Sequence, residues 1–246
     1  MRKRLDEMLK EHGLVASRSQ ANDLVKRGHV YVDGNLACKS GSKISSGARL
    51  SVAPEAEAQY VSRSALKLKH ALQKFQFDPK GLDVLDAGAS TGGFTEVLLE
   101  QGATRVFAVD VGHGQLHQKL RKNSRVISLE KQDVRNLTLS MFPTSFKGIT
   151  IDLSFISLVK VLPFLFDLAS EKCWLVALIK PQFEVGKKAI GKGGIVKNKT
   201  AVTDAIKSVE DQFNQLHGWF VKDIIPSPLR GGSGNEEYLI GAYRNV

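Results

Sequence analysis

The chain has 246 residues, of which 42% are hydrophobic and 24% are charged, as is usual for a globular protein with one large domain or a large and a small one. No apolar run approaches the ~20 residues that span a bilayer, and no apolar stretch follows the basic N-terminus, so we expect neither a membrane segment nor a signal peptide. The two cysteines, Cys38 and Cys173, and the six histidines lack metal-ligand spacing, so we expect no metal and reduced thiols in a cytoplasmic protein.

The charge balance points to a polyanionic partner. Lys and Arg number 35 against 25 Asp and Glu, which gives a net charge of +10. Net charge informs about association rather than about fold, and many basic proteins are merely well solvated. Residues 1–52 hold ten of the basic and five of the acidic residues, so half of the excess lies in the first fifth of the chain. This concentration favours nucleic acid as the partner.

Two short helices are predicted at the start of the chain. Apolar residues at helical spacing begin at Leu5. Ser17 with Gln20 has the pattern of a capping box for a second helix, which ends at Gly28, a common C-terminal signal.

A hairpin follows these helices. Residues 30–32 alternate as a strand does, the Asp33-Gly34 pair is a strong hairpin turn, and 50–52 reads as a closing strand. We therefore predict a small α+β domain over 1–52, a polar linker over 53–60 and a second domain over 61–246.

The second domain alternates apolar runs with helical stretches after an amphipathic entry helix at 66–72. The apolar runs lie at 84–85, 106–109, 126–127, 149–151 and 174–179, the helical stretches lie near 93–101, 157–169 and 199–216, and strand-like stretches at 219–225 and 237–243 end the chain. Such alternation predicts an α/β fold with a mostly parallel sheet covered on both faces, and the closing hairpin puts one antiparallel strand into it.

A glycine-rich turn joins a strand to a helix within 83–94. In an α/β sheet this turn lies at the carboxyl end of the strand, where ligands bind, and glycine lets the backbone approach them closely. The spacing of Gly88, Gly92 and Gly93 differs from the dinucleotide pattern, and no P-loop lysine follows. Asp86, before the glycines, suits a ligand with a cationic amino-acid end.

Two more acids follow the next two strands. Asp110 comes 24 residues after Asp86, a distance at which a carboxylate can accept hydrogen bonds from ribose hydroxyls. Asp133 stands where a side chain could meet an adenine amino group. Each acid alone is more often a cap or turn residue, but the ordered series favours S-adenosylmethionine over NAD or a nucleoside triphosphate. The predicted cofactor-binding residues are Asp86, Gly88, Ala89, Ser90, Thr91, Gly92, Gly93, Phe94, Asp110, Val111, Asp133 and Asp152.

Particular motifs also resemble known families. Residues 4–6, 17–18, 21, 24–25 and 28–34 resemble the S4 family of RNA-binding domains. The second domain resembles the FtsJ-type RNA 2'-O-methyltransferases, and the chain as a whole resembles the TlyA family, often labelled haemolysin A. This likeness is carried by 60–68, 83–94, 110–116, 152–157, 178–184, 226–228 and 234–239. It implies a Rossmann-like class I methyltransferase sheet after a small S4 domain, with S-adenosylmethionine as cofactor.

FtsJ-like enzymes use a Lys-Asp-Lys-Glu tetrad, which by motif position falls on Lys67, Asp152, Lys180 and Glu237. Glu236 is a neighbouring alternative, but the match to Asn-x-Glu-Tyr favours Glu237. A ribose 2'-hydroxyl is a poor nucleophile, and a lysine takes its proton only when burial or a second cation lowers the lysine pKa. The resemblance implies Lys180 as base or oxyanion stabiliser and Lys67 as orienting group, with the two acids holding the lysines.

The resemblance also implies RNA contacts on a basic helical face. The expected phosphate contacts are Arg2, Lys3, Arg4, Arg18, Lys26 and Arg27. In the second domain the basic, glycine-rich stretch 186–194 is a hypothetical lid over the target nucleotide, with Lys187, Lys188 and Lys192 on the RNA backbone. The plainer alternatives are a solvated charged face and a flexible loop.

The function that the resemblance implies is S-adenosylmethionine-dependent 2'-O-methylation of cytidine in ribosomal RNA, free or in a subunit. The chain starts almost directly with the S4 motif and stops after its last strand, which leans toward large-subunit RNA over small-subunit RNA. A non-catalytic ribosome-assembly factor, a membrane-active haemolysin and a base methyltransferase are the alternatives. The intact tetrad argues against an assembly factor and against a base methyltransferase. The absence of a transmembrane run argues against a haemolysin. The sequence carries no signal for an oligomeric state.

Overall fold

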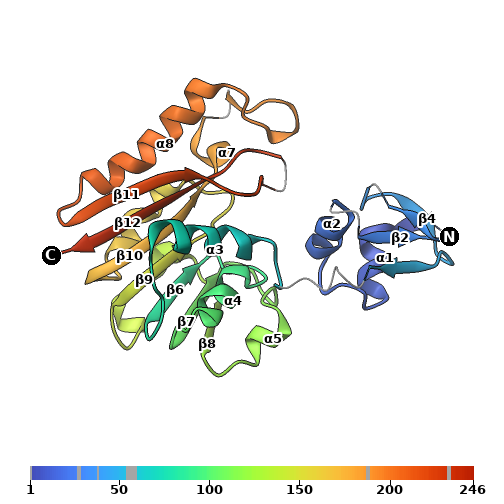
Figure 1. Cartoon of the computed structure of the whole chain (residues 1–246), viewed down its shortest axis with the longest axis horizontal. Helices are drawn as coiled ribbons and strands as arrows, with labels where there is room; N and C mark the ends of the chain where they lie inside the picture. Colours follow the sequence, from blue (N-terminus) through green and yellow to red (C-terminus); the bar gives the residue numbers. More distant parts are fainter. Residues whose placement is uncertain (1, 27–28, 38, 54–59, 187–188, 232–233) are drawn as a thin grey trace. The chain divides into compact units, whose positions relative to one another are not determined.

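A computed structural model describes residues 2–26, 29–37, 39–53, 60–186, 189–231 and 234–246 (Figure 1). The chain divides into two compact units, Met1–Arg63 and Ser64–Val246. The predicted linker at 53–60 stays a prediction, because 54–59 lie outside the described residues.

The first unit is small and mixed. Its helices are α1 (Leu5–Glu11) and α2 (Arg18–Lys26), and its strands are β1 (Arg2–Arg4), β2 (Val30–Val32), β3 (Asn35–Leu36), β4 (Lys43–Ser45) and β5 (Leu50–Val52). The strands form a β3-β2-β5 sheet and a separate β1-β4 pair, which the sequence did not predict. Leu5, Leu9 and Leu24 are fully buried between the helices and the sheet.

Local signals in this unit are confirmed. The Gln20 N–H donates to Ser17 Oγ at 3.1 Å, and the Gln20 side chain in turn accepts from the Ala16 N–H. Asp33 and Gly34 both have positive φ, at 52° and 81°, as a tight hairpin turn with a right-handed strand twist requires. The predicted helix stop at Gly28 lies outside the described residues.

The second unit is a seven-stranded sheet in the order β11-β12-β10-β9-β6-β7-β8. Its strands are β6 (Asp83–Ala87), β7 (Arg105–Asp110), β8 (Val126–Glu130), β9 (Phe146–Ile151), β10 (Ala169–Ile179), β11 (Trp219–Pro226) and β12 (Tyr238–Asn245). The pairs among β6 to β10 are parallel, whereas β12 runs antiparallel to both β10 and β11. The predicted Rossmann-like sheet with one antiparallel strand is confirmed.

Helices cover both faces of this sheet (Figure 1). The helices are α3 (Ser64–Phe75), α4 (Gly93–Glu100), α5 (Gln118–Arg121), α6 (Leu162–Phe166), α7 (Pro181–Glu184) and α8 (Lys199–Asn214), with short 3-10 turns η2 (Val134–Asn136), η3 (Leu139–Met141), η4 (Leu158–Lys160) and η6 (Lys192–Gly194). Alternation along β12 separates the two layers: Gly241 meets Phe75 of α3, whereas Ile240 and Ala242 join the core that contains Phe213 of α8.

One predicted helix is wrong. The stretch 157–169 forms only the turn η4 and the short helix α6, and β10 already begins at Ala169. Pro163 lies in the first turn of α6. Because proline lacks an N–H and its ring clashes with the preceding turn, a helix can start there but cannot run through. The apolar residues of this stretch are core residues of short elements.

Candidate active site

Lys67 and Glu237 form a buried ion pair. Lys67 lies on the inner face of α3 with 6% of its surface exposed, Glu237 precedes β12 with 5% exposed, and Lys67 Nζ lies 2.5 Å from Glu237 Oε2. Lysine and glutamate are almost never fully buried unless they are paired. The backbone of Gly231 packs directly on the Glu237 carboxylate, where any side chain would displace it.

The packing of α3 on β12 brings this lysine inside. The Phe75 ring lies over Gly241, at which an added Cβ would come within 2.5 Å of the ring. Glycine is therefore required for the close approach of helix and strand. This contact fixes the rotation of α3, so that Lys67 faces the sheet and Leu66 is 39% exposed.

A second lysine–carboxylate pair follows β9 and β10. Lys180 Nζ lies 2.7 Å from Asp152 Oδ1 and donates a hydrogen bond to Ser154 Oγ at 2.8 Å. Lys180 is 8% exposed and ends the apolar strand β10, just before Pro181. The ammonium of Lys180 is therefore held by one hydrogen bond, to Ser154, and by the charge of the Asp152 carboxylate.

Strand register places the two pairs side by side. Ile179 pairs with Tyr238 across the antiparallel β10–β12 ladder, so the next residues, Lys180 and Glu237, lie opposite each other at its end. Ala177 pairs with Ile151 in the parallel β9–β10 ladder, which puts Asp152 at the same edge. The four predicted tetrad positions thus gather at the carboxyl edge of the parallel strands, where α/β proteins bind ligands.

The glycine turn adjoins this edge. Gly88, Ser90 and Gly92 have positive φ, at 89°, 48° and 98°. A Cβ at Gly88 would lie 2.7 Å from the Asp152 carbonyl oxygen, so only glycine lets the turn lie against the end of β9. Thr91 and Gly93 complete the turn and the start of α4.

Asp110 holds the turn at the end of β7. Its carboxylate accepts from the Ser90 N–H at 2.8 Å and from the Gly112 N–H at 2.7 Å. A narrow cleft with a volume of only about 10 Å³ lies beside it, lined by Ala89, Ser90, Ala108, Asp110, Gly112, Gln115, Leu116, Ser128 and Glu130. Val111, next to Asp110, is 68% exposed.

Gln115 and Glu130 are cleft residues that the sequence analysis missed. The Gln115 amide lies against Gly112 and 3.3 Å from the Ser90 hydroxyl, so it covers Asp110. Glu130 ends β8 and accepts from the Gly114 N–H at 2.9 Å, which lowers the pKa of this carboxyl below its ordinary value. An acid at the end of β8 was expected at Asp133, three residues later.

Asp133 itself is engaged elsewhere. Its carboxylate caps η2 and contacts the Arg135 guanidinium through both oxygens. The hydrogen bonds from Arg135 lower the pKa of Asp133 to about 2. Asp133 does not line the cleft beside Asp110, and its contact with a cofactor stays a prediction.

Asp86 and Phe94 lie beneath the turn. Asp86 is fully buried, and its carboxyl accepts hydrogen bonds from the hydroxyls of Thr95 at 2.6 Å and Thr150 at 3.0 Å. Burial above all raises the pKa of Asp86 to about 7. The negative charge of Asp152 also raises this pKa, whereas the hydrogen bonds from the two hydroxyls lower it. Phe94 is 2% exposed. Both residues support the turn from below.

The segment after Asp152 contacts α7 through residues that lie in the family motifs but were given no role from the sequence. Phe155 is 90% exposed with φ of 66°, and its ring centroid lies 5.1 Å from that of Phe183 on α7. Such strain in a non-glycine residue is typical of functional sites. Glu184 accepts from the Ser157 hydroxyl and from the Leu158 N–H, which ties this segment to α7.

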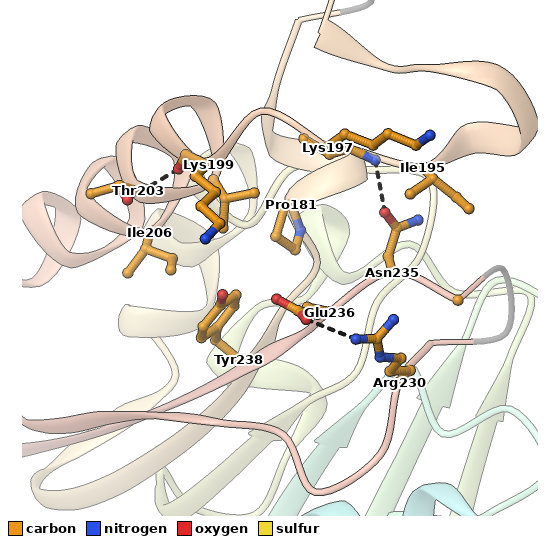
Figure 2. A pocket seen from close by; sticks show the side chains of 13 residues that line it. Pro181, Ile195, Lys197, Lys199, Thr203, Ile206, Arg230, Asn235, Glu236 and Tyr238 are labelled. Atoms are coloured by element: carbon orange, nitrogen blue, oxygen red, sulfur yellow. Dashed lines mark hydrogen bonds and ion pairs between the residues drawn. The ribbon is translucent and has the colours of Figure 1, made fainter.

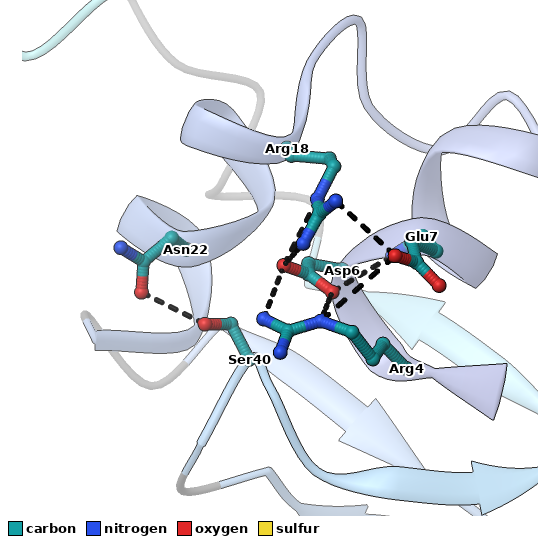
Figure 3. Close-up of polar contacts among 6 residues, drawn as sticks. All are labelled: Arg4, Asp6, Glu7, Arg18, Asn22 and Ser40. Carbon is teal, nitrogen blue, oxygen red and sulfur yellow. Dashed lines mark hydrogen bonds and ion pairs between the residues drawn. The ribbon is translucent and has the colours of Figure 1, made fainter.

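Three of the predicted phosphate contacts in the first unit are paired with carboxylates, and Figure 3 shows two of them, Arg4 and Arg18. Arg4 and Arg18 both donate to the Asp6 carboxylate at 2.9–3.2 Å, Arg18 also contacts Glu7 at 3.1 Å, and hydrogen bonds from Arg4 above all lower the pKa of Asp6 to about 2. Lys3 likewise pairs with Glu11, at 2.8 Å, and Arg2 is exposed.

Other predicted RNA contacts are only partly visible. Arg27, Lys187 and Lys188 lie outside the described residues, as do the side chains of Lys26 and Lys192. Among the residues that are described, no three His, Cys, Asp or Glu side chains gather to hold a metal ion. None of the described helices has the length and apolar character needed to cross a membrane.

Known proteins share this sequence and fold. Residues 60–244 match the FtsJ-like methyltransferase family and residues 3–50 match the S4 domain. The 16S/23S rRNA (cytidine-2'-O)-methyltransferase TlyA of Mycobacterium tuberculosis is 44% identical over 97% of this chain and 89% of its own length. Hemolysin A of Brachyspira hyodysenteriae is 36% identical over 96% of this chain and 98% of its own length.

A solved structure from Streptococcus thermophilus has the same architecture. It superposes with a TM-score of 0.78 and 38% identity, over 99% of this chain and 89% of that one. Both domains, their order and the sheet topology therefore agree with one group of relatives. The chain belongs to the FtsJ-like methyltransferases and, within them, to the TlyA family.

Proposed function

We propose that this methyltransferase transfers the methyl group of S-adenosylmethionine to the 2'-oxygen of a cytidine ribose in ribosomal RNA. The observation that carries the proposal is the pairing of Lys67 with Glu237 and of Lys180 with Asp152 at one sheet edge, beside the glycine turn. A protein that only bound RNA would have no need to bury two lysines and two carboxylates there.

The residues around the turn fit this cofactor. Asp110 and Glu130 offer carboxylate oxygens at the ends of β7 and β8, suited to ribose hydroxyls. The left-handed backbone at Gly88 and Gly92 lets the turn pack closely on the end of β9 and on Leu120, which fixes the shape of the turn. Gln115 covers Asp110 and has to move when the cleft is filled. When bound, the cofactor supplies an electrophilic methyl group on a sulfonium sulfur.

The protein's own part is to hold the hydroxyl and to manage its proton. Lys180 Nζ is held by its hydrogen bond to Ser154 and by the charge of Asp152, which leaves N–H positions for the 2'-oxygen. Lys180 accepts the proton in its neutral form, or donates to the developing oxyanion as an ammonium. Lys67, fixed by Glu237, adds positive potential at the same oxygen. General base catalysis contributes ~10²–10⁴-fold, so alignment of the two substrates supplies much of the remaining acceleration.

The RNA partner rests on the first unit and on the relatives. The S4 match covers residues 3–50, and the name of the mycobacterial relative states 16S/23S rRNA as its substrate. We expect large-subunit RNA as the substrate, with small-subunit RNA as the second candidate. We expect the protein to work in the cytoplasm, where ribosomes are. The basic residues of the S4 unit position the RNA without reading its sequence.

Methyl transfer from labelled cofactor to purified ribosomal RNA tests the proposal. The wild type should yield 2'-O-methylcytidine after nuclease digestion, and Lys180→Ala should lower kcat by ~10²-fold or more. Lys160→Ala, on the exposed face of η4, is the matched control and should leave the rate unchanged. A base-methylated nucleoside would overturn the acceptor. RNA binding without any turnover would favour an assembly factor.

A further inference from the structure

A second pocket lies directly behind the catalytic strand ends (Figure 2). Its volume is about 640 Å³, within the range of about 300–1,000 Å³ that is usual for ligand pockets. Its lining includes Pro181, Lys197, Lys199, Arg230, Asn235 and Tyr238.

The pocket shares its wall with the catalytic residues. Pro181 follows Lys180 in the chain, and Glu236 and Tyr238 flank Glu237. Neighbouring side chains of an extended segment point to opposite sides, so Glu237 turns to Lys67 while Glu236 and Tyr238 face the pocket. A ligand in the pocket therefore rests one residue away from two members of the tetrad.

The pocket walls are tied together by a buried amide. Asn235 is 2% exposed; its Oδ1 accepts from the Val196 N–H at 2.9 Å and its Nδ2 donates to the Gly194 carbonyl at 2.8 Å. These bonds hold the segment before α8 against the segment before β12, and Figure 2 shows the bond that Asn235 Oδ1 accepts from the main chain next to Lys197. The pocket is thus a formed feature of the fold.

The charges of the pocket select an anion. Arg230 contacts Glu236 at 2.9 Å. Within the described part of the chain, no carboxylate lies within ion-pair distance of the Lys197 or Lys199 ammonium. Lys199 is also the first residue of α8, where the helix dipole disfavours a cation. A lysine placed against this local preference indicates a functional role.

The lining also offers a surface for a base. Tyr238 presents a half-buried ring, and Ile195, Val202 and Ile206 provide apolar neighbours. An aromatic ring beside free cations is the combination with which proteins bind single-stranded nucleic acid, because every base has a face to stack and every phosphate has a charge.

We propose that this pocket binds a nucleotide of the RNA substrate next to the methylated one, with its phosphate on Lys199 and its base against Tyr238. The inference rests on the proposed function, since it takes RNA to be the substrate. It adds a site that fixes the RNA strand on the far side of β12, so that the target ribose is held from two sides.

Paired substitutions on one helix test the pocket. Lys199→Gln removes a pocket cation, and Lys207→Gln removes a cation two turns further along α8, where Lys207 pairs with Asp211. Both variants change the net charge equally. We expect Lys199→Gln to raise KM for ribosomal RNA about tenfold with kcat within twofold, and Lys207→Gln to change neither. The Tm of Lys199→Gln should be equal to or higher than that of the wild type, because the cation opposes the helix dipole.

Direct binding separates this inference from the proposed function. Titration of labelled ribosomal RNA at several salt concentrations needs no turnover, and the slope of log K against log salt should fall by about 0.7 for Lys199→Gln only. Equal effects of both substitutions would show diffuse attraction and overturn the pocket. Absence of methyl transfer by the wild type, with the Lys199 effect on binding intact, would overturn the reaction and leave the pocket standing.

Discussion

The buried pair of Lys67 and Glu237 permits a sharp test by a double-mutant cycle. The variants are Lys67→Met, Glu237→Gln and the combination of both. The two side chains are 8% and 4% exposed, so removal of one partner leaves an uncompensated charge in the interior. Such a loss typically costs ~3–5 kcal/mol, whereas replacing both partners can be nearly neutral. The double variant should therefore be more stable than at least one single variant.

The size of this effect is well within reach of measurement. A domain of 150–250 residues loses roughly 2–4 °C of Tm per kcal/mol, so each single variant should unfold roughly 6–20 °C below the wild type. The two tryptophans of the chain, Trp174 and Trp219, are 8% and 5% exposed and both belong to the catalytic unit. Their fluorescence during thermal or urea unfolding reports on this unit and is blind to the S4 unit.

Two results would refute the reasoning. Single variants within ~0.5 kcal/mol of the wild type would mean that the pair is solvated in solution, as exposed pairs are. A double variant that loses the sum of the two single effects would mean that the side chains act independently. Activity is a separate readout, since all three variants lack a tetrad member and should lose turnover whatever their stability.

Three further predictions concern the turn and the groups beneath it. Gly88→Ala should abolish cofactor binding in calorimetry, because its Cβ would lie 2.7 Å from the carbonyl oxygen of Asp152. Gly81→Ala is the control and should bind the cofactor normally, because Gly81 has a similar positive φ but open space around it. Ser154→Ala should lower kcat about tenfold with KM for RNA unchanged, because it frees one N–H of Lys180; a rise in KM alone would contradict the assigned role. The pKa of Asp86 is raised to about 7 in the folded state, so the folded protein keeps a proton that the unfolded chain releases near pH 4. Its contribution to stability therefore falls as pH rises from about 4 to 7, by up to ~1.4 kcal/mol per pH unit, and Asp86→Asn should flatten urea midpoints measured across that range.

The glycine turn was predictable because its signal is local. A strand, glycines at fixed spacing and a helix follow one another within 83–94, and each glycine has a backbone reason that is visible in the chain itself. The mostly parallel sheet with one antiparallel strand followed from the alternation of strands and helices and from the closing hairpin, whereas the order of the strands was not predicted. Short-range sequence determines the individual elements, but the order of the strands depends on contacts between distant parts of the chain.

Burial of Lys67 could not be predicted from pattern alone. Without a family resemblance, the apolar residues Leu66 and Leu68 define the inner face of the entry helix, and Lys67 reads as a surface residue. The structure exposes Leu66 and buries Lys67, because the contact of Phe75 with Gly241 on β12 sets the rotation of α3. That contact joins residues 166 positions apart, and no local signal contains it.

The pairing of two basic residues in the S4 unit could not be predicted from the sequence either. Arg4 and Arg18 were expected to be free phosphate contacts, but Asp6 lies between them and holds both guanidinium groups. An acid in the first turn of a helix normally reads as a favourable dipole interaction. Its second role, fixing the orientation of two arginines, depends on where α2 packs and is visible only in three dimensions.

The place of β12 has a consequence for the order in which the sheet assembles. This strand lies between β10 and β11, and Glu237 directly precedes it. The strands β6 to β10 pair in parallel with one another, whereas in the described sheet β11 pairs with β12 alone. Because β11 has no place in the sheet until β12 has paired with β10, we expect the two strands and the Glu237 carboxylate to join the sheet together, after the parallel strands.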